Sequence, residues 1–215
     1  MTANPPKVRK VPSPPAVLKL DQARHIVEFQ APLWRVYRTQ GGYPQTWDEL
    51  RHFGPVDNMR FDPHPLPPGI HADSGVLYAA TLPHTALGEV YQETRNIQRA
   101  FQGNAIVSWT PTRPLVLLDL TSNWPVINGG AASMQMDAKE RTCEWARAID
   151  QQFGADIDGL SHRSSINHQP MVTLFARTER IPAFPARPAF HALLIDPSAD
   201  MIVDRAVQEL GFTSS

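Results

Sequence analysis

Proline is the residue that most limits what this chain can fold into. Its ring fixes the backbone and removes a hydrogen-bond donor, so proline is unfavourable in helix interiors and central strands. The sequence holds 21 prolines in 215 residues, and many of them gather near the N-terminus, in residues 63–68 and in residues 182–188. These three segments are therefore predicted to be extended loops or arms.

The length of the chain predicts one domain that is large enough to bury a core. We place a proline-rich N-terminal arm at residues 1–16 and a single domain at residues 17–215. Hydrophobic residues make up 42% and charged residues 19% of the sequence, as is typical of soluble globular proteins. The formal net charge is -1, which gives no overall positive field to attract nucleic acid or an anionic membrane. We therefore predict no direct binding to nucleic acid or to membranes.

Cys143 is the one cysteine of the chain, so no internal disulfide can form and a cysteine-based metal site is implausible. It lies in a helical pattern beside Trp145, where it is predicted to be a small buried apolar residue. No apolar run has the length of a membrane span, and the N-terminus lacks the apolar core of a secretion signal. These features predict a cytoplasmic protein.

Hydrophobic periodicity predicts strands and helices in an irregular order. Strands are predicted at 33–38, 76–80, 105–109, 114–120 and 171–175, and helices at 18–29, 83–101, 137–153 and 198–210. Residues 41–75 are expected to carry little regular structure, and loops of this length commonly frame a site. Residues 158–165 are expected to form a turn. Because strands and helices do not alternate regularly, we predict an α+β fold.

Several familiar site motifs are absent from the sequence. It has neither a glycine-rich phosphate-binding spacing nor a Gly-x-Ser-x-Gly nucleophile turn. The eight histidines are scattered, and none of their spacings with nearby acids suits a metal ion. We therefore predict no metal site, and these motifs assign no function.

Four short segments are more informative in their order than any one of them alone. They are LWRV at 33–36, MRFD at 59–62, VLYA and ALGE within 76–89, and DGLSHRS at 158–164, which leads into the strand predicted at 171–175. In this order they resemble the RES-domain family, the toxin half of RES–Xre toxin–antitoxin pairs, over about residues 32–180. The resemblance implies a compact fold similar to ADP-ribosyltransferases, with a small central β-sheet flanked by helices, and an activity on NAD.

The resemblance also implies which residues form the site. The family's basic residue after the first strand falls on Arg35, its arginine on Arg60, its tyrosine on Tyr78, its glutamate on Glu89 and its serine on Ser164, with Ser165 as the alternative register. There are two departures from the family pattern. Asn58 and Met59 replace glycines expected before the arginine, and His162 replaces a tyrosine that often lies two residues before the serine.

These residue types suit cleavage of the bond between nicotinamide and ribose in NAD. A carboxylate such as Glu89 can stabilise the positive charge that develops on the ribose. Arg60 and Arg35 offer planar cations for the pyrophosphate, and Tyr78 offers a ring and a hydroxyl for the nicotinamide. Ser164 can hold the nicotinamide amide, a phosphate or the incoming nucleophile. Each residue type also has an ordinary structural role, such as a serine that bonds its own turn.

The resulting hypothesis is a toxin-like enzyme that consumes NAD as a glycohydrolase or phosphorylase and arrests growth. Two alternatives remain open: a protein mono-ADP-ribosyltransferase, and a catalytically weakened module that binds a nucleotide or a protein. Water, phosphate and a protein side chain can all attack the same ribose carbon, so the residues do not choose the acceptor. The resemblance implies NAD and an Xre-type antitoxin as partners, and the sequence leaves open whether the chain forms a homo-oligomer.

Overall fold

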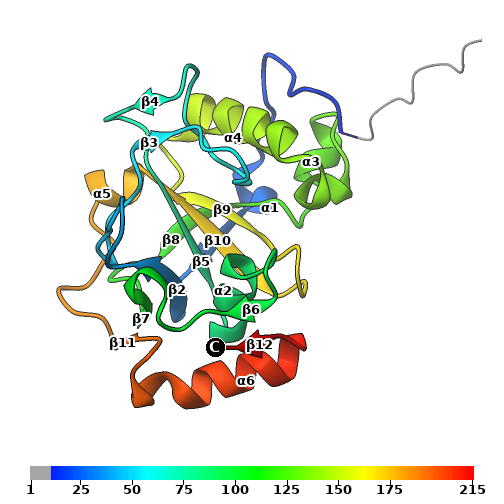
Figure 1. The fold of residues 1–215 in the computed structure, drawn as a ribbon. Helices are drawn as coiled ribbons and strands as arrows, with labels where there is room; N and C mark the ends of the chain where they lie inside the picture. Colours follow the sequence, from blue (N-terminus) through cyan, green and yellow to red (C-terminus); the bar gives the residue numbers. More distant parts are fainter. Residues whose placement is uncertain (1–10) are drawn as a thin grey trace, which may run out of the picture.

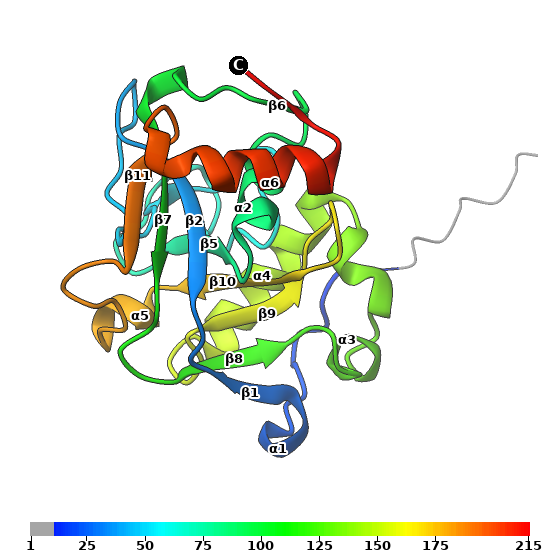
Figure 2. The same ribbon diagram turned by 90° about the horizontal axis from the view of Figure 1, so that it is seen from below.

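An eight-stranded mixed sheet forms the centre of the structure, a computed structural model that describes residues 11–215 (Figures 1 and 2). Neighbouring strands run antiparallel except β8 and β9, which are parallel. In spatial order the strands are β1 (Ile26–Phe29), β8 (Leu115–Asp119), β9 (Gly159–Arg163), β10 (Pro170–Phe175), β5 (Val76–Ala80), β2 (Leu33–Arg38), β7 (Asn104–Trp109) and β11 (Phe190–Leu193).

Shorter elements complete the described part of the chain. Two small sheets pair β3 (Phe53–Gly54) with β4 (Gly69–Ile70), and β6 (Asn96–Ile97) with β12 (Thr213–Ser214). The α-helices are α1 (Gln22–His25), α2 (Pro83–Val90), α3 (Trp124–Ile127), α4 (Lys139–Phe153), α5 (Arg177–Arg180) and α6 (Asp200–Leu210). Short 3-10 helices cover Phe101–Gly103, Ala132–Met136 and Pro197–Ala199.

One face of the central sheet carries the long helices, and we call it the helical face. Under α4, Trp145 and Ile149 pack with Leu160 of β9. Under α2 and α6, Leu87 and Val203 pack with residues of β7 and β11. Figure 1 shows α4 and α6 at opposite ends of the molecule. The strands between these two helical layers, chiefly β10 and β5, are therefore left without a helix over their centre.

The opposite face is covered by loops, and we call it the loop face. Leu33, Leu77 and Val172 point to this face and form a core cluster with Leu50. Trp47, from the long loop after β2, packs there in tilted contact with Trp109 and edge-on to Phe184. Aromatic side chains from irregular segments thus cover this face of the sheet, as helices cover the other face.

The predicted strands at 33–38, 76–80, 105–109, 114–120 and 171–175 are confirmed to within one residue at each end, and the last two helices end where predicted but begin two residues later. Residues 41–75 carry little regular structure, as expected, apart from the two-residue strands β3 and β4. The predicted α+β fold with a central sheet flanked by helices is confirmed. These elements were predictable because their apolar periodicity matches the surface that they bury.

Three predicted elements are wrong. The helix at 18–29 is a single turn, α1, followed by β1, because Ile26–Phe29 pairs with Leu115–Leu118 at the edge of the sheet. The helix predicted at 83–101 begins at Pro83 but ends at Val90. Beyond it, Arg95 adopts a left-handed conformation with φ of 50° and leads into β6. The turn predicted at 158–165 is mostly strand β9, which is held between β8 and β10.

The predicted N-terminal arm lies only partly in the described residues, since residues 1–10 fall outside them. Val11 is fully buried in the cluster beneath α4, and the indole Nε1 of Trp145 donates to the carbonyl of Pro12 at 2.9 Å. Residues 11–12 therefore pack on the domain, and the boundary at residue 16 stays a prediction. Within residues 11–215, no helix combines the length and the apolar character needed to cross a bilayer.

Candidate functional site

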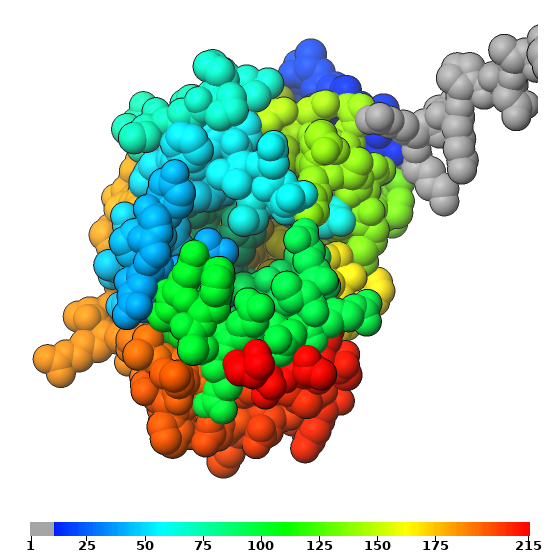
Figure 3. Space-filling view, in the orientation of Figure 1, coloured from blue at the N-terminus to red at the C-terminus, as the bar shows by residue number. Residues whose placement is uncertain are grey.

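The candidate site lies on the helical face, where the two helical layers leave the strands uncovered. Strand pairing sets Tyr78 of β5 directly opposite Thr173 of β10, and His162 of β9 opposite Met171. The space-filling view shows a hollow in this part of the surface, between the loop segment that precedes β4 and the segment that follows α2 (Figure 3). Segments far apart in the sequence therefore border one depression.

Glu89 is fixed in place by the segment that follows β9. Its Oε1 accepts hydrogen bonds from the hydroxyl of Ser164 at 2.6 Å and from the backbone N–H of Ser165 at 3.1 Å. Among residues 11–215, no hydrogen-bond partner is found for the other carboxylate oxygen, Oε2. The side chain is partly exposed. Glu89 is thus an oriented carboxylate with one oxygen free for a ligand.

Ser164 uses its whole hydrogen-bonding capacity in this arrangement. Its Oγ donates to Glu89 and accepts from the backbone N–H groups of Ile166 at 3.0 Å and Asn167 at 3.3 Å. A serine hydroxyl offers one donor and two acceptor positions, so all are engaged. The side chain is also buried, with 1% exposed. The geometry makes Ser164 a positioning residue for Glu89.

The end of α2 is held against this segment by close packing. The amide of Asn167 donates to the hydroxyl of Thr85 at 3.0 Å, one turn before Glu89. A Cβ on Gly88 would lie 3.2 Å from Leu210 and 3.5 Å from Ile166. The small residue before Glu89 therefore lets α2 approach both α6 and the segment after β9.

Tyr78 presents a hydroxyl without a partner. Its OH group is buried and makes no hydrogen bond within the described residues, although the ring is partly exposed. Burial, and then the nearby Asp62, raise the pKa of Tyr78 well above its usual value, against the lowering effect of Arg51. The phenol is therefore protonated at neutral pH and can donate to a ligand.

Asp62 and Arg51 lie beside Tyr78 and were missed in the sequence. Asp62 is fully buried, and its carboxylate accepts from Arg51 Nη2 at 2.8 Å and from the N–H of Val56 at 3.1 Å. Its other oxygen contacts His64 Nδ1 at 2.5 Å. Burial alone would raise the pKa of Asp62, but the bonds from His64 and Arg51 hold it well below its usual range. Asp62 is the last residue of the MRFD segment, and this position is the sequence feature from which it could have been predicted as a site residue.

Arg60 lies on a loop that docks against α4. Its guanidinium donates to the carbonyl of Asp137, and the Sγ of Cys143 donates to the carbonyl of Met59 at 3.3 Å. Cys143 is buried, as predicted. Asn58 adopts a left-handed conformation with φ of 70°, which asparagine tolerates better than most residues. The loop thus keeps a backbone turn of the kind that glycine favours.

His162 is a buried neutral residue. Its Nε2 lies 2.9 Å from the hydroxyl of Thr173, and its ring centroid lies 4.9 Å from that of Phe61. Burial, with a further contribution from Arg60, lowers the pKa of His162 to about 4. The imidazole is therefore uncharged at neutral pH and supports the floor of the site.

Arg35 lies apart from the other predicted site residues. The pairing of Trp34 with Ala80 puts these two side chains on the same face of the sheet, so Arg35 points to the loop face. It is 7% exposed and donates to the carbonyls of Thr46, Trp47 and Glu49 and to the side chain of Gln45. Burial lowers the pKa of Arg35 to about 10, so the group stays charged. The structure brings Glu89, Ser164, Tyr78 and Arg60 to the helical face and sets Arg35 behind it.

Comparison with known proteins gives one family. The model of the RES domain matches residues 32–200. The chain belongs to the RES domain family. The match covers every predicted site residue and most of the central sheet, so the predicted family is confirmed.

A solved structure resembles this RES domain over most of its length. It is the crystal structure of the M. tuberculosis MbcT–MbcA toxin–antitoxin complex, in which one chain superposes with a TM-score of 0.54 at 16% sequence identity. The superposition covers 87% of this chain and 92% of that chain. At this identity the likeness supports the fold. No curated protein matches the sequence.

Proposed function

We propose that this RES domain is the toxin of a toxin–antitoxin pair and that it cleaves the bond between nicotinamide and ribose in NAD. The reaction is that of a glycohydrolase or a phosphorylase, and loss of NAD arrests growth. Family membership supports the class of protein. The anchored carboxylate of Glu89 is the single observation that supports the chemistry most strongly.

Glu89 has the placement that this chemistry requires. As nicotinamide leaves, positive charge grows on the ribose, and a fixed carboxylate stabilises that charge without having to reorganise. Ser164 and Ser165 hold Oε1, which leaves Oε2 for a ribose hydroxyl or the developing cation. We therefore assign Glu89 as the catalytic residue and Ser164 as the residue that positions it.

The other residues of the helical face suit the two ends of NAD. The protonated hydroxyl of Tyr78 can donate to the carboxamide of nicotinamide, and the ring can stack on it. Arg60, on the loop that docks against α4, is the candidate for the pyrophosphate. Arg35 is occupied by four acceptors on the loop face, so in this proposal it positions the loop at residues 45–49 and does not touch NAD.

The decisive assay is release of nicotinamide by the purified full chain. NAD is supplied with water alone or with inorganic phosphate, and the products are separated by chromatography. Free ADP-ribose would identify a glycohydrolase, and ADP-ribose 1″-phosphate would identify a phosphorylase. In a third arm, labelled NAD is added with cell lysate, where labelled protein bands would assign transfer to protein instead. Absence of nicotinamide in all three arms, from protein shown to be folded, would refute the proposal.

The antitoxin is proposed to be an Xre-type protein encoded with this chain. The similar M. tuberculosis structure is a toxin–antitoxin complex, which supports a protein partner for the present chain. Expression of this RES domain alone in the cytoplasm of a host cell should arrest growth, and co-expression of an Xre-type protein encoded beside it should restore growth. Growth arrest that persists with the partner present, when both proteins are made, would contradict this part of the proposal.

A further inference from the structure

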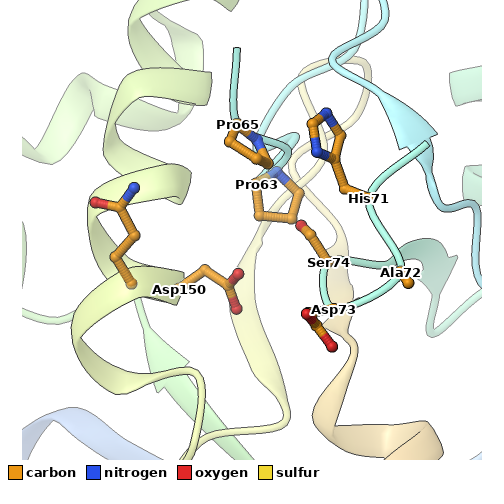
Figure 4. A pocket seen from close by; sticks show the side chains of 8 residues that line it. Pro63, Pro65, His71, Ala72, Asp73, Ser74 and Asp150 are labelled. Atoms are coloured by element: carbon orange, nitrogen blue, oxygen red, sulfur yellow. The ribbon is translucent and has the colours of Figure 1, made fainter. Parts of the chain in front are cut away.

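A second pocket lies between α4 and the loop that leads into β5, away from Glu89. Its volume is about 290 Å³. The walls include Pro63, Pro65, His71, Asp73, Ser74 and Asp150 (Figure 4). None of the residues that line it belongs to the candidate site, since Glu89, Ser164, Tyr78 and Arg60 are all absent from its wall. The pocket is thus separate from the depression on the helical face.

Ser74 carries a buried hydroxyl that nothing in the chain satisfies. The residue is 7% exposed, and its Oγ makes no hydrogen bond with any residue in 11–215. Leaving a buried hydroxyl unpaired is unfavourable, and natural cores contain few such groups. Because Ser74 lines the pocket, a ligand bound there is the natural partner for this oxygen.

Asp150 faces the same space from α4. Figure 4 shows its carboxylate directed across the pocket toward Ser74 and Asp73. Within residues 11–215 it forms no ion pair closer than 4 Å. Burial raises the pKa of Asp150 to about 6, against the lowering effects of Arg180 and His64. At neutral pH the pocket therefore holds a carboxylate that lacks a close cationic partner.

We propose that this pocket binds a small aliphatic amine through its primary ammonium group. An ammonium has three N–H donors and no acceptor, which matches the Ser74 hydroxyl oxygen and the Asp150 carboxylate, with Asp73 at the rim. The alkyl part lies along the rings of Pro63 and Pro65. The carboxylates disfavour an anion, and the volume fits a small molecule. The inference is independent of the reaction at Glu89.

The test uses n-butylammonium chloride as the probe and the full chain at pH 7.5. Isothermal titration calorimetry and the thermal unfolding midpoint report binding. We expect saturable binding and a midpoint that rises with probe concentration. Tetramethylammonium chloride has the same charge but no N–H donor, so it should give neither effect at the same ionic strength.

Two variants remove the side-chain groups proposed to bind the ammonium while keeping the size of the side chains nearly unchanged. Ser74→Ala deletes the unpaired hydroxyl, and Asp150→Asn replaces a partly buried charge by a neutral group of the same shape. Each should weaken n-butylammonium binding at least about tenfold, which corresponds to about 1.4 kcal/mol. Both should be at least as stable as wild type in the absence of probe, because one removes an unpaired buried hydroxyl and the other a partly buried charge. Asp204→Asn, on the exposed side of α6, should bind as wild type does.

Several results would overturn the inference. They are absence of saturable binding by n-butylammonium, equal binding by tetramethylammonium, and unchanged affinity in both Ser74→Ala and Asp150→Asn. Saturable binding of Mg²⁺ with no binding of the amine would also overturn it, since it would assign the pocket to a metal ion.

Discussion

The polar side chains on the two faces of the central sheet differ in how completely they are hydrogen-bonded. On the loop face, the guanidinium of Arg35 meets four acceptors from residues 45–49 and is closed off from solvent. On the helical face, Glu89 is anchored through one oxygen only, and the hydroxyl of Tyr78 is without a partner in the described chain. Satisfied groups hold the fold together, whereas oriented groups with spare capacity are available to a ligand.

The buried carboxylate of Asp158 is as fully hydrogen-bonded as Arg35 on the loop face. Asp158 is fully buried and accepts two bonds from Arg113, one from Arg177 and one from the N–H of Val116, all at 2.7 or 2.8 Å. This cluster ties the start of β9 to β8 and α5. Variants of the satisfied clusters should therefore lower stability, and variants of Glu89 should lower activity.

Asp158→Asn should produce the largest loss of stability. Removing one partner of a buried charged network typically costs about 3 kcal/mol, and here it leaves two arginines without their carboxylate. Chemical denaturation at pH 7 measures the loss, with Asp156→Asn on the exposed surface nearby as the control. A loss of stability no greater than that of the control would contradict the claim that the Asp158 cluster stabilises the fold.

The effect of Asp158→Asn should also depend on pH. Burial would raise the pKa of Asp158, but the bonds from Arg113, Val116 and Arg177 lower it below its usual value. A lowered pKa in the folded state contributes stability above the unfolded pKa, and this is lost as pH falls through the folded pKa. The difference between wild type and Asp158→Asn should therefore shrink under acid conditions.

Arg35→Met should give the next largest loss of stability. The substitution leaves the carbonyls of residues 46, 47 and 49 without their donor, at a cost of about 2 kcal/mol. Arg38→Met changes an exposed arginine that lies three residues further along β2, on the helical face, and it should cost less than about 0.5 kcal/mol. Equal losses for the two variants would show that Arg35 does not anchor the loop.

Ser164→Ala should lower stability by about 1 kcal/mol, since it deletes one hydrogen bond to Glu89 and the acceptor for two backbone N–H groups. Nicotinamide release should fall as well, mainly in kcat, because the carboxylate loses its main anchor. Ser165→Ala keeps the backbone N–H that bonds Glu89, so it should change little. If Ser165→Ala has the larger effect on both readouts, the assignment of Ser164 is wrong.

Asp150→Asn should change stability in the opposite direction to the variants above, by an amount that depends on pH. The pKa of Asp150 is raised to about 6, above the value of about 3.9 for an unfolded aspartate. The stabilisation by its proton is therefore fully present below about pH 3.9 and lost as pH rises through about 6. Asp150→Asn should unfold at a higher temperature than wild type above pH 6, and the advantage should vanish near pH 4. An advantage that does not vary with pH would contradict this.

The sequence predicts the parts of the site that depend on local pattern. The β5 strand and the start of α2 at Pro83 follow from apolar spacing and from the proline, and they carry Tyr78 and Glu89. The alternation of β2 also places Arg35 and Arg38 on opposite faces. Which of these faces carries the site depends on the register between Trp34 and Ala80, and local spacing does not contain that register.

Tertiary contacts account for most of what the sequence did not predict. β9 contains Ser161, His162 and Arg163, whose polar character is typical of a turn, but His162 finds Thr173 on the next strand. α2 ends early because the segment after it turns back and pairs through β6 with β12, far away in the sequence. The bond between Arg51 and Asp62 joins two positions in an irregular loop, where no periodicity brings them together.

The central claim is that Glu89 serves catalysis, whereas Arg35 serves the fold. It is tested by measuring nicotinamide release and the free energy of unfolding for Glu89→Gln, with Glu93→Gln on the exposed segment after α2 as the control. We predict that Glu89→Gln lowers kcat/KM for NAD by at least about 100-fold, while stability changes by less than about 1 kcal/mol. The control should match wild type in both. A Glu89→Gln variant that is unstable, or that releases nicotinamide as fast as wild type, would contradict the claim.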